Sequence, residues 1–239
     1  MLAAGPGRRL HPLTEGLPKT LLPLADGRTI LDLALANLFS VGIEDVVVVT
    51  GSGAERVEER VAGLERRHGV HIELVYNDRA EEWNNAYSLW LAREAWRDGA
   101  LLVNGDTVHP AAVEERLLSE RGADVLLAVD DEKPLAEEEM KVLLAADGGV
   151  RRISKHADPV SAAGEYIGVA LIEPSAAGPL AEALEATWRR DPSLYYEDGF
   201  QKLAEDGGNV RAAPIGSVDW VEVDDHADLA RAREIACRF

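Results

Sequence analysis

Residues 45–76 read DVVVVTGSGAERVEERVAGLERRHGVHIELVY. The two ends of this stretch, Asp45–Thr50 and His71–Tyr76, are short apolar runs rich in β-branched residues, which is typical of buried strands. Between them, apolar residues such as Val57 and Leu64 recur at helical spacing, while charged residues occupy the other positions. A strand, an amphipathic crossover helix and a second strand in this order predict a parallel βαβ unit.

The same alternation continues along the chain. Two further β-rich runs cover Ala100–Asn104 and Ala123–Val129. Between about Met140 and Ile172 the pattern changes to short strands broken by turn residues, which predicts hairpins in a small β/α insertion on the substrate side. Helices are expected at about Ala176–Arg189, Tyr196–Glu205 and Asp225–Ala236. The sequence therefore predicts an α/β fold with a mostly parallel sheet flanked by helices.

The composition limits the kinds of partner. With 239 residues, 46% of them hydrophobic, and no apolar run of membrane-spanning length, we expect a soluble globular protein without a membrane partner. The formal net charge of -18 repels other polyanions, so no nucleic-acid surface is expected and an anionic ligand needs a local cluster of cations. The only cysteine is Cys237, and no charged-then-apolar leader precedes the first motif, so we expect a cytoplasmic protein.

The opening segment has the features of a phosphate-binding loop. Residues 2–24 read LAAGPGRRLHPLTEGLPKTLLPL, and only Met1–Ala4 precede the first glycine, which are too few for a full strand. Either the first strand is short or the start of the protein lies upstream, and the sequence leaves both alternatives open. Glycines let the backbone approach a ligand closely, and consecutive N–H groups can surround phosphate oxygens. Arg8 and Lys19 would add positive charge for a triphosphate. A lone Gly-x-Gly with nearby cations is also an ordinary surface turn, so the interpretation depends on the whole segment.

Carboxylates that suit a metal ion occur at two places. Asp106 follows the apolar run LLVNG, which should put it at the carboxyl end of a buried strand, where ligands bind in open α/β sheets. Glu222 and Asp224 alternate along a short apolar run and should share one face of a strand. Such carboxylates suit Mg²⁺, although Asp106 could also form a turn, and Asp224 or Asp225 could cap the final helix.

The opening segment resembles the N-terminal signature of the nucleotidyltransferases that act on sugar 1-phosphates and on phosphocholine. Its motif pieces are Ala4-Gly5, Gly7-Arg8-Arg9-Leu10-His11-Pro12-Leu13-Thr14 and Pro18-Lys19. The resemblance implies a Rossmann-like, GT-A-like fold in which Arg9 and Lys19 act catalytically on the NTP phosphates. It also implies that the loop backbone faces the nucleotide, although Arg8 replaces the hydroxyl residue of the family. The loop residues placed at the nucleotide in this way are Leu2, Ala3, Ala4, Gly5, Gly7 and Arg8.

Two later motifs fit the same family. Asn104-Gly105-Asp106 is similar to its Gly-Asp metal motif, and residues 220–229, WVEVDDHADL, are similar to its C-terminal segment. The resemblance implies that Asp106, Glu222 and Asp224 share Mg²⁺ with the NTP phosphates. The implied reaction is attack of an acceptor phosphate or phosphonate oxygen on the α-phosphorus, with pyrophosphate as leaving group and no protein nucleophile.

The stretch that follows the predicted strand His71–Tyr76 indicates which nucleotide is used. Residues 77–91 read NDRAEEWNNAYSLWL, and Asn84-Asn85-Ala86-Tyr87-Ser88-Leu89 resembles the phosphocholine cytidylyltransferases, with a similar motif in the inositol-phosphate cytidylyltransferases. Both branches imply CTP, with Asn84, Asn85 and Ser88 at the nucleotide. The side chains of Asn also cap helices well, so the residues by themselves leave both roles open.

Three residues are candidates for the acceptor phosphate region. Lys155, in Ile153-Ser154-Lys155, and Glu165, in the segment from Gly164 to Gly168, resemble the family's acceptor segment, in which a Lys pairs with the acceptor phosphate. Lys141 is a second candidate for that cation. For either lysine, an exposed strand position is an alternative explanation.

A second acceptor region contains Tyr196, Glu197 and Asp198. Aromatic faces and carboxylates can hold an amine by cation–π and ionic attraction, and the same residues also suit the start of a helix. Phosphocholine-type enzymes have a similar Tyr-x-Glu-Asp segment. That resemblance favours an amine-bearing acceptor such as phosphocholine or an aminoalkylphosphonate, with inositol phosphate still open.

The sequence thus predicts a Mg²⁺-dependent cytidylyltransferase with a single domain over residues 1–239. Residues 1–130 would mainly bind the nucleotide, 131–215 the acceptor, and 216–239 would supply the metal strand and final helix. One alternative is a sugar 1-phosphate nucleotidyltransferase that uses UTP or dTTP, and another is a non-catalytic nucleotide-binding protein. A homodimer is left open by the sequence.

Overall fold

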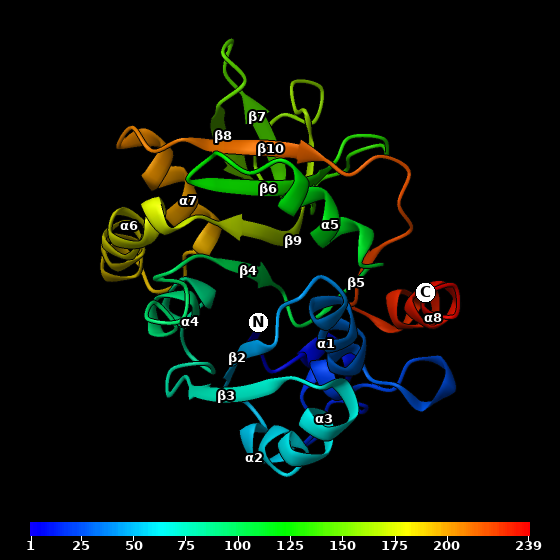
Figure 1. Ribbon diagram of the computed structural model, residues 1–239. Helices are drawn as coiled ribbons and strands as arrows, with labels where there is room; N and C mark the ends of the chain where they lie inside the picture. Colours follow the sequence, from blue (N-terminus) through cyan, green and yellow to red (C-terminus); the bar gives the residue numbers. More distant parts are fainter. The chain divides into compact units, whose positions relative to one another are not determined.

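The computed structural model describes residues 1–239, apart from the side chain of Asp26, and divides the chain into two compact units (Figure 1). The first unit consists of Met1–Glu82, Val103–Glu114 and Val218–Phe239. The second unit consists of Trp83–Leu102 and Glu115–Ser217. The predicted division of labour at residues 130 and 215 stays a prediction.

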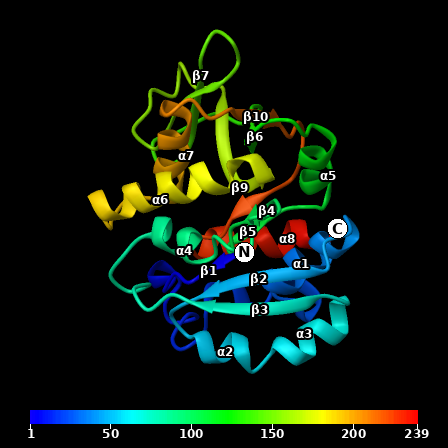
Figure 2. The ribbon, with the colours of Figure 1, turned by 60° about the vertical axis from the view of Figure 1, so that its left-hand side comes forward.

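The first unit contains a parallel sheet in the order β1-β2-β3. Its strands are β1 (Leu2–Ala3), β2 (Asp45–Thr50) and β3 (His71–Tyr76). Figure 2 shows α2 and α3 beside β3, on the connection between β2 and β3. The predicted βαβ unit is confirmed, and the first strand has two residues.

One helix differs from its prediction. The crossover between β2 and β3 is not a single helix but two, α2 (Ala54–Glu58) and α3 (Val61–His68). Val57 and Leu64 are both buried, as the helical spacing predicts. Because this spacing continues across the interruption, the pattern of apolar residues does not reveal the break.

The remaining elements of the first unit surround an apolar cluster. They are η1 (Arg8–Leu10), η2 (Lys19–Leu21), η3 (Ala25–Gly27), α1 (Ile30–Ser40), β5 (Thr107–Val108), β11 (Val221–Glu222) and α8 (His226–Ala236). Strands β5 and β11 pair antiparallel. The buried side chains between these elements include Leu10, Ile30, Leu33, Val108, Val223 and Leu229. This packing joins the loop after β1 to the C-terminal helix, which are far apart in the sequence.

The second unit contains a mixed sheet in the order β10-β6-β9-β7-β8, with β4 also paired to β9. Strand β10 runs parallel to β6, whereas β6–β9, β9–β7 and β7–β8 are antiparallel pairs. The predicted hairpin region is confirmed by β7, β8 and β9. The strands are β4 (Ala100–Val103), β6 (Val125–Asp130), β7 (Lys141–Leu144), β8 (Val150–Ser154), β9 (Gly164–Ile172) and β10 (Val210–Pro214).

Helices pack on one another beside this sheet. Helix α7 contacts β8, β10 and α6, and α4 contacts both α6 and α7. The helices are α4 (Asn85–Leu91), α5 (Ala112–Ser119), η4 (Pro174–Ala176), α6 (Ala177–Arg190) and α7 (Tyr196–Glu205). The α/β class with flanking helices is therefore confirmed. No helix in the described part of the chain has the length and hydropathy to cross a bilayer.

Asp32 ties α1 to α3 in the first unit. Its Oδ2 accepts hydrogen bonds from the backbone N–H (3.0 Å) and the hydroxyl (2.7 Å) of Thr29, the residue that caps α1. Its Oδ1 lies 2.7 Å from Nη1 of Arg67 and 2.8 Å from Nε2 of His68, at the end of α3. Burial by itself would raise the pKa of Asp32, but the hydrogen bonds from His68, Thr29 and Arg67 outweigh it and lower the pKa to about 2.

We expect Asp32→Asn to lower the free energy of unfolding at pH 7 by about 2 kcal/mol. The folded pKa lies below the unfolded one, so the stabilisation is complete above pH 5 and is lost as the pH falls toward 2. Urea denaturation of both proteins at pH 7, 5 and 3 measures this, with the difference expected to shrink toward pH 3. Glu59→Gln, which removes one partner of the exposed Arg56–Glu59 pair, is the control and should change stability by less than about 0.5 kcal/mol. A pH-independent difference would contradict the role given to the Asp32 charge.

Candidate active site

The loop after β1 is shaped by two close contacts. Gly7 has φ 59°, and a Cβ there would lie 3.1 Å from Cγ2 of Thr14. The Thr14 hydroxyl donates a hydrogen bond to the carbonyl of Gly7 (2.9 Å). Leu10 is fully buried and anchors the short helix η1, whereas Arg8 and Arg9 on the same turn are exposed. The loop therefore holds its backbone against Thr14 while two cations project from it.

Gly105 brings Asp106 close to the end of β1. Its N–H donates to the carbonyl of Leu2 (2.8 Å), and Leu2 also forms a parallel bridge with Asn104. A Cβ on Gly105 would lie 2.7 Å from the Leu2 oxygen and 3.0 Å from Cβ of Ala3. Only a residue without a side chain fits here, which explains the Gly-Asp pair of the motif.

Three carboxylates gather in the first unit. Oxygens of Asp106, Glu222 and Asp224 all lie within 4.8 Å of one another. Strand pairing brings them together, because Glu222 is paired with Thr107 and the N–H of Val223 donates to the Asp106 carbonyl (2.9 Å). Carboxylate oxygens are the ligands that hard divalent cations prefer, so this cluster could hold one. The structure thus brings together the three residues that the sequence named for a metal.

The two predicted catalytic cations, Lys19 and Arg9, pair with this cluster. Nζ of Lys19 lies 2.9 Å from Oδ2 of Asp106 and 2.9 Å from Oδ1 of Asp224. Nη2 of Arg9 lies 2.7 Å from Oδ2 of Asp224. Asp224 therefore receives one cation on each of its two oxygens.

These pairs keep Lys19 and Asp224 charged. Burial by itself would lower the pKa of Lys19, but attraction to Asp106 and Asp224 outweighs it and raises the pKa above its ordinary value. Burial would likewise raise the pKa of Asp224, yet Lys19 and Arg9 hold that pKa below its ordinary value. Three carboxylates against two cations leave negative charge that a divalent cation would offset.

Arg8 points elsewhere. Its Nη2 lies 3.4 Å from Oε2 of Glu81, and both side chains are exposed. This pair was not predicted, since nothing in the sequence relates the glycine loop to the segment after β3. The contact of Arg8 with a nucleotide stays a prediction.

The residues predicted to read the base lie in the second unit, at the start of α4. Oδ1 of Asn84 accepts from the N–H of Asn85 (2.8 Å) and so caps the helix, while its Nδ2 donates to the carbonyl of Ser193 (3.0 Å). Oδ1 of Asn85 accepts from the N–H of Tyr196 (2.9 Å). Ser88 is buried. Of the two roles that the sequence left open, the helix cap is observed, and contact with a base stays a prediction.

The predicted amine region forms the start of α7. Tyr196 is fully buried, and its hydroxyl donates to that of Tyr166 (3.1 Å), so its ring is part of the core. Oδ2 of Asp198 accepts from the N–H of Tyr195 (2.9 Å). Glu197 is only 5% exposed, burial raises its pKa to about 7, and its Oε2 has no hydrogen-bond partner among the described residues. Glu197 is therefore the carboxylate of this region with capacity for a ligand.

The other acceptor candidates have different surroundings. Lys155 Nζ lies 5.5 Å from the ring centroid of Tyr195. Glu165 is buried and forms an ion pair with Lys133, while burial raises its pKa. Lys141 is also buried, which differs from the exposed strand position that the sequence suggested. Its Nζ donates to the carbonyls of Ala136, Glu137 and Glu139.

Those three carbonyls use the three donors of the Lys141 ammonium group, so Lys141 serves to fold the loop before β7. A role at the acceptor would require these bonds to break. We therefore leave Lys141 out of the site proposed below.

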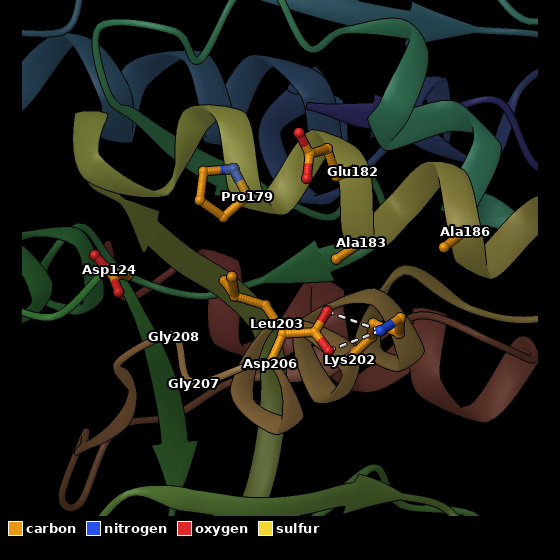
Figure 3. Close-up of a pocket in the computed structure, with 10 residues that line it drawn as sticks. All are labelled: Asp124, Pro179, Glu182, Ala183, Ala186, Lys202, Leu203, Asp206, Gly207 and Gly208. Carbon is orange, nitrogen blue, oxygen red and sulfur yellow. Dashed lines mark hydrogen bonds and ion pairs between the residues drawn. The ribbon is translucent and has the colours of Figure 1, made fainter.

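The second unit has two further features that the sequence did not indicate. Trp83, Tyr87, Trp90 and Trp188 form an aromatic cluster in which Trp83 stacks on Trp188 with ring centroids 5.6 Å apart. A pocket of about 600 Å³ lies between α6 and α7 (Figure 3). Two of its four charged residues, Lys202 and Asp206, pair with each other (2.7 Å), and none of the predicted site residues lines it. We assign no role to this pocket.

Comparisons with known proteins agree with the motifs. A sequence model of the family described as MobA-like NTP transferase domain matches residues 1–204. The CMP-5'-(3-aminopropyl)phosphonate synthase of Streptomyces rubellomurinus is 33% identical over 97% of this chain and 37% of that protein. The choline-phosphate cytidylyltransferase of Streptococcus pneumoniae is 35% identical over 39% of this chain and 38% of that protein. Each match thus covers well under half of the relative's own length.

A solved structure has the same fold. The inositol-1-phosphate CTP transferase from T. maritima matches with a TM-score of 0.81 and 24% identity, over 98% of this chain and 94% of that chain. The likeness confirms the predicted nucleotidyltransferase-like α/β fold.

Gly105→Ala should destabilise the protein by about 1 to 3 kcal/mol, because the new Cβ would overlap the Leu2 carbonyl and force β1 away from Asp106. Gly63→Ala in α3 is the matched control. A Cβ there meets nothing within 4 Å, so the substitution should leave stability unchanged or raise it by up to about 1 kcal/mol. Thermal or urea unfolding measures both. Equal effects of the two substitutions would show that the approach of Gly105 to β1 is not tight.

Proposed function

We propose that this chain, which belongs to the family of MobA-like NTP transferase domains, is a cytidylyltransferase that joins CMP to a small amine-bearing phosphonate or phosphorylated alcohol. CTP would be the donor and pyrophosphate the second product. The observation that carries the proposal is the cluster of three carboxylates paired with Lys19 and Arg9 beside the glycine loop.

The carboxylate cluster suits Mg²⁺. Asp106, Glu222 and Asp224 supply hard oxygen ligands, and their negative charge exceeds that of the paired cations. When bound, Mg²⁺ would offset negative charge on the triphosphate and on the leaving pyrophosphate.

The remaining catalytic work falls to residues of the loop. Lys19 stays protonated and would neutralise a phosphate oxygen as a point charge, while Arg9 would bind with its planar fork. The backbone from Ala3 to Gly7 would approach the nucleotide, since Gly5 and Gly7 have no side chain to block it. The acceptor oxygen is already ionised near neutral pH, so positioning can replace a general base.

The relatives and the start of α7 support the proposed nucleotide and the proposed acceptor. Two of the curated relatives are a CMP-5'-(3-aminopropyl)phosphonate synthase and a choline-phosphate cytidylyltransferase, and both names include a cytidylyl group and a nitrogen-bearing acceptor. Glu197 is a buried carboxylate with an oxygen that lacks a partner in the described structure, which suits an ammonium group. Lys155 would pair with the phosphonate or phosphate.

Pyrophosphate release with each of the four NTPs, against pools of aminoalkylphosphonates, phosphocholine, inositol phosphate and hexose 1-phosphates, tests the proposal. Release should require Mg²⁺, CTP and an amine-bearing acceptor. Asp106→Ala should lower kcat by about a thousandfold or more, and Lys19→Met by about a hundredfold to a thousandfold, because each removes charge stabilisation from the transition state. Release only with UTP or dTTP and hexose phosphates would instead assign the chain to the sugar branch.

The matched control for Lys19→Met is Lys202→Met. It removes the same charge from the exposed Lys202–Asp206 pair in α7 and should leave kcat unchanged. Circular dichroism of all variants checks that the fold is intact. Full activity of folded Asp106→Ala would refute the metal assignment.

The pH dependence should depend on the acceptor. The pKa of Glu197 is raised to about 7, so its carboxylate is mostly protonated below that pH and can attract an ammonium group only above it. We expect kcat/KM for 3-aminopropylphosphonate to rise with pH through about 7, and Glu197→Gln to remove the part of this rise that comes from Glu197.

Propylphosphonate is the control acceptor, because it has a titrating phosphonate but no amine. Its profile should be the same in wild type and Glu197→Gln. If Glu197→Gln leaves the profile for the amine-bearing acceptor unaltered, Glu197 does not hold the amine.

A further inference from the structure

Two adjacent asparagines connect the start of α4 to the start of α7. The backbone N–H of Asn84 donates to the carbonyl of Pro192 (2.8 Å), and its Nδ2 donates to the carbonyl of Ser193 (3.0 Å). Oδ1 of Asn85 accepts from the N–H of Tyr196 (2.9 Å), the first residue of α7. All three bonds join residues more than about 100 positions apart, so they are tertiary contacts and not part of a local cap.

The bond to Asn85 is placed where it determines the start of α7. The first N–H groups of a helix have no partner within the helix, and an outside acceptor such as Asn85 satisfies one of them. On the other side of Tyr196, the hydroxyl is fixed by Tyr166 (3.1 Å). The backbone and the ring of Tyr196 are thus held from two directions.

Glu197 is the next residue in the chain. Its side chain is 5% exposed, so its direction follows from the backbone at the start of α7 and not from free rotation in solvent. An oxygen of Glu197 has no hydrogen-bond partner in the described part of the structure. A small shift of Tyr196 would therefore move this oxygen of Glu197.

Packing supports the same connection. Trp83, directly before the two asparagines, stacks on Trp188 of α6 with a centroid separation of 5.6 Å. Helix α4 contacts both α6 and α7. The asparagines thus lie where the three helices α4, α6 and α7 contact one another.

We propose that Asn85, supported by Asn84, is a positioning residue for the acceptor, which holds Glu197 in place through the N–H of Tyr196. This inference rests on the proposed function, because it takes Glu197 as the group that binds the acceptor amine. It differs from the prediction made from the sequence, in which both asparagines contact the nucleotide.

Steady-state kinetics of Asn85→Ala and Asn85→Asp test the proposal. Asn85→Ala removes the acceptor of the Tyr196 N–H and should raise the KM for 3-aminopropylphosphonate about tenfold, as loss of one partly buried hydrogen bond can do. The KM for CTP should change by less than about twofold, which separates acceptor positioning from nucleotide contact. Asn85→Asp keeps an oxygen at the same place, so it should restore the KM of the acceptor to near the wild-type value.

Asn84→Asp examines the second residue of the pair. It keeps the oxygen that caps α4 but replaces the donor to Ser193 with another oxygen. We expect it to raise the acceptor KM while the KM for CTP stays unchanged. A substitution that only lowers the folded fraction would reduce the apparent kcat for both substrates and leave both KM values alone.

Calorimetric binding of CTP and of 3-aminopropylphosphonate, each measured separately, makes the test independent of turnover. Failure of the proposed function would show in the wild type, as absence of binding or turnover with these compounds, and would overturn this inference with it. Failure of the inference alone would show only in the variants. A rise in the KM or Kd for CTP with an unaltered acceptor value in Asn85→Ala, or no change in either, would overturn it.

Discussion

The ion pairs of Asp224 with Lys19 and Arg9 allow three carboxylates to lie within 4.8 Å of one another. Two like charges about 4 Å apart repel by about 4 kcal/mol where the effective dielectric is about 20. Without opposite charge nearby, one of the carboxylates would take up a proton or turn away. Lys19, placed 2.9 Å from both Asp106 and Asp224, offsets part of this repulsion and keeps the oxygens directed to one point.

The fold supplies this arrangement through contacts that tolerate little change. Gly105 lies against the Leu2 carbonyl, the pairing of β5 with β11 aligns Glu222 with Thr107, and both constraints act on the backbone on either side of Asp106. The loop with Arg9 is anchored by the buried Leu10, which belongs to the same apolar cluster as Val223. The backbone that bears the charged groups is therefore held by an apolar cluster in which the N-terminal loop packs against the C-terminal segment.

Much of this could be predicted because the signals are local. The runs Asp45–Thr50 and His71–Tyr76 form strands with the predicted bounds, and α7 spans the predicted Tyr196–Glu205. The three carboxylates were named because two short motifs, Asn104-Gly105-Asp106 and residues 220–229, resemble those of the nucleotidyltransferases. The break between α2 and α3 was missed because the apolar spacing continues through it.

Contacts that depend on the path of a loop or on the packing of two helices were not predictable from such signals. Lys141 reads as an ordinary strand residue, and only the path of the loop before β7 shows that three carbonyls surround its ammonium group. The bond between Asn85 and Tyr196 likewise depends on how α4 and α7 pack. In both cases a polar side chain satisfies backbone groups, those of a neighbouring loop for Lys141 and that of a distant helix for Asn85, and composition carries no record of the partner.

The charge of the whole chain sets the condition under which this site works. A formal charge of -18 repels a free triphosphate that approaches the protein, and physiological salt screens this repulsion beyond about 8 Å. Lys19 and Arg9 attract at short range only, and their charge is already engaged by Asp224 and Asp106. A triphosphate that arrives with a divalent cation carries less negative charge, and it brings a cation for the carboxylates together with anions for Lys19 and Arg9. The carboxylates then pair with the metal ion, and Lys19 and Arg9 pair with the phosphates, so each charged group that loses a partner gains another. We therefore expect the metal ion and the nucleotide each to bind more tightly in the presence of the other.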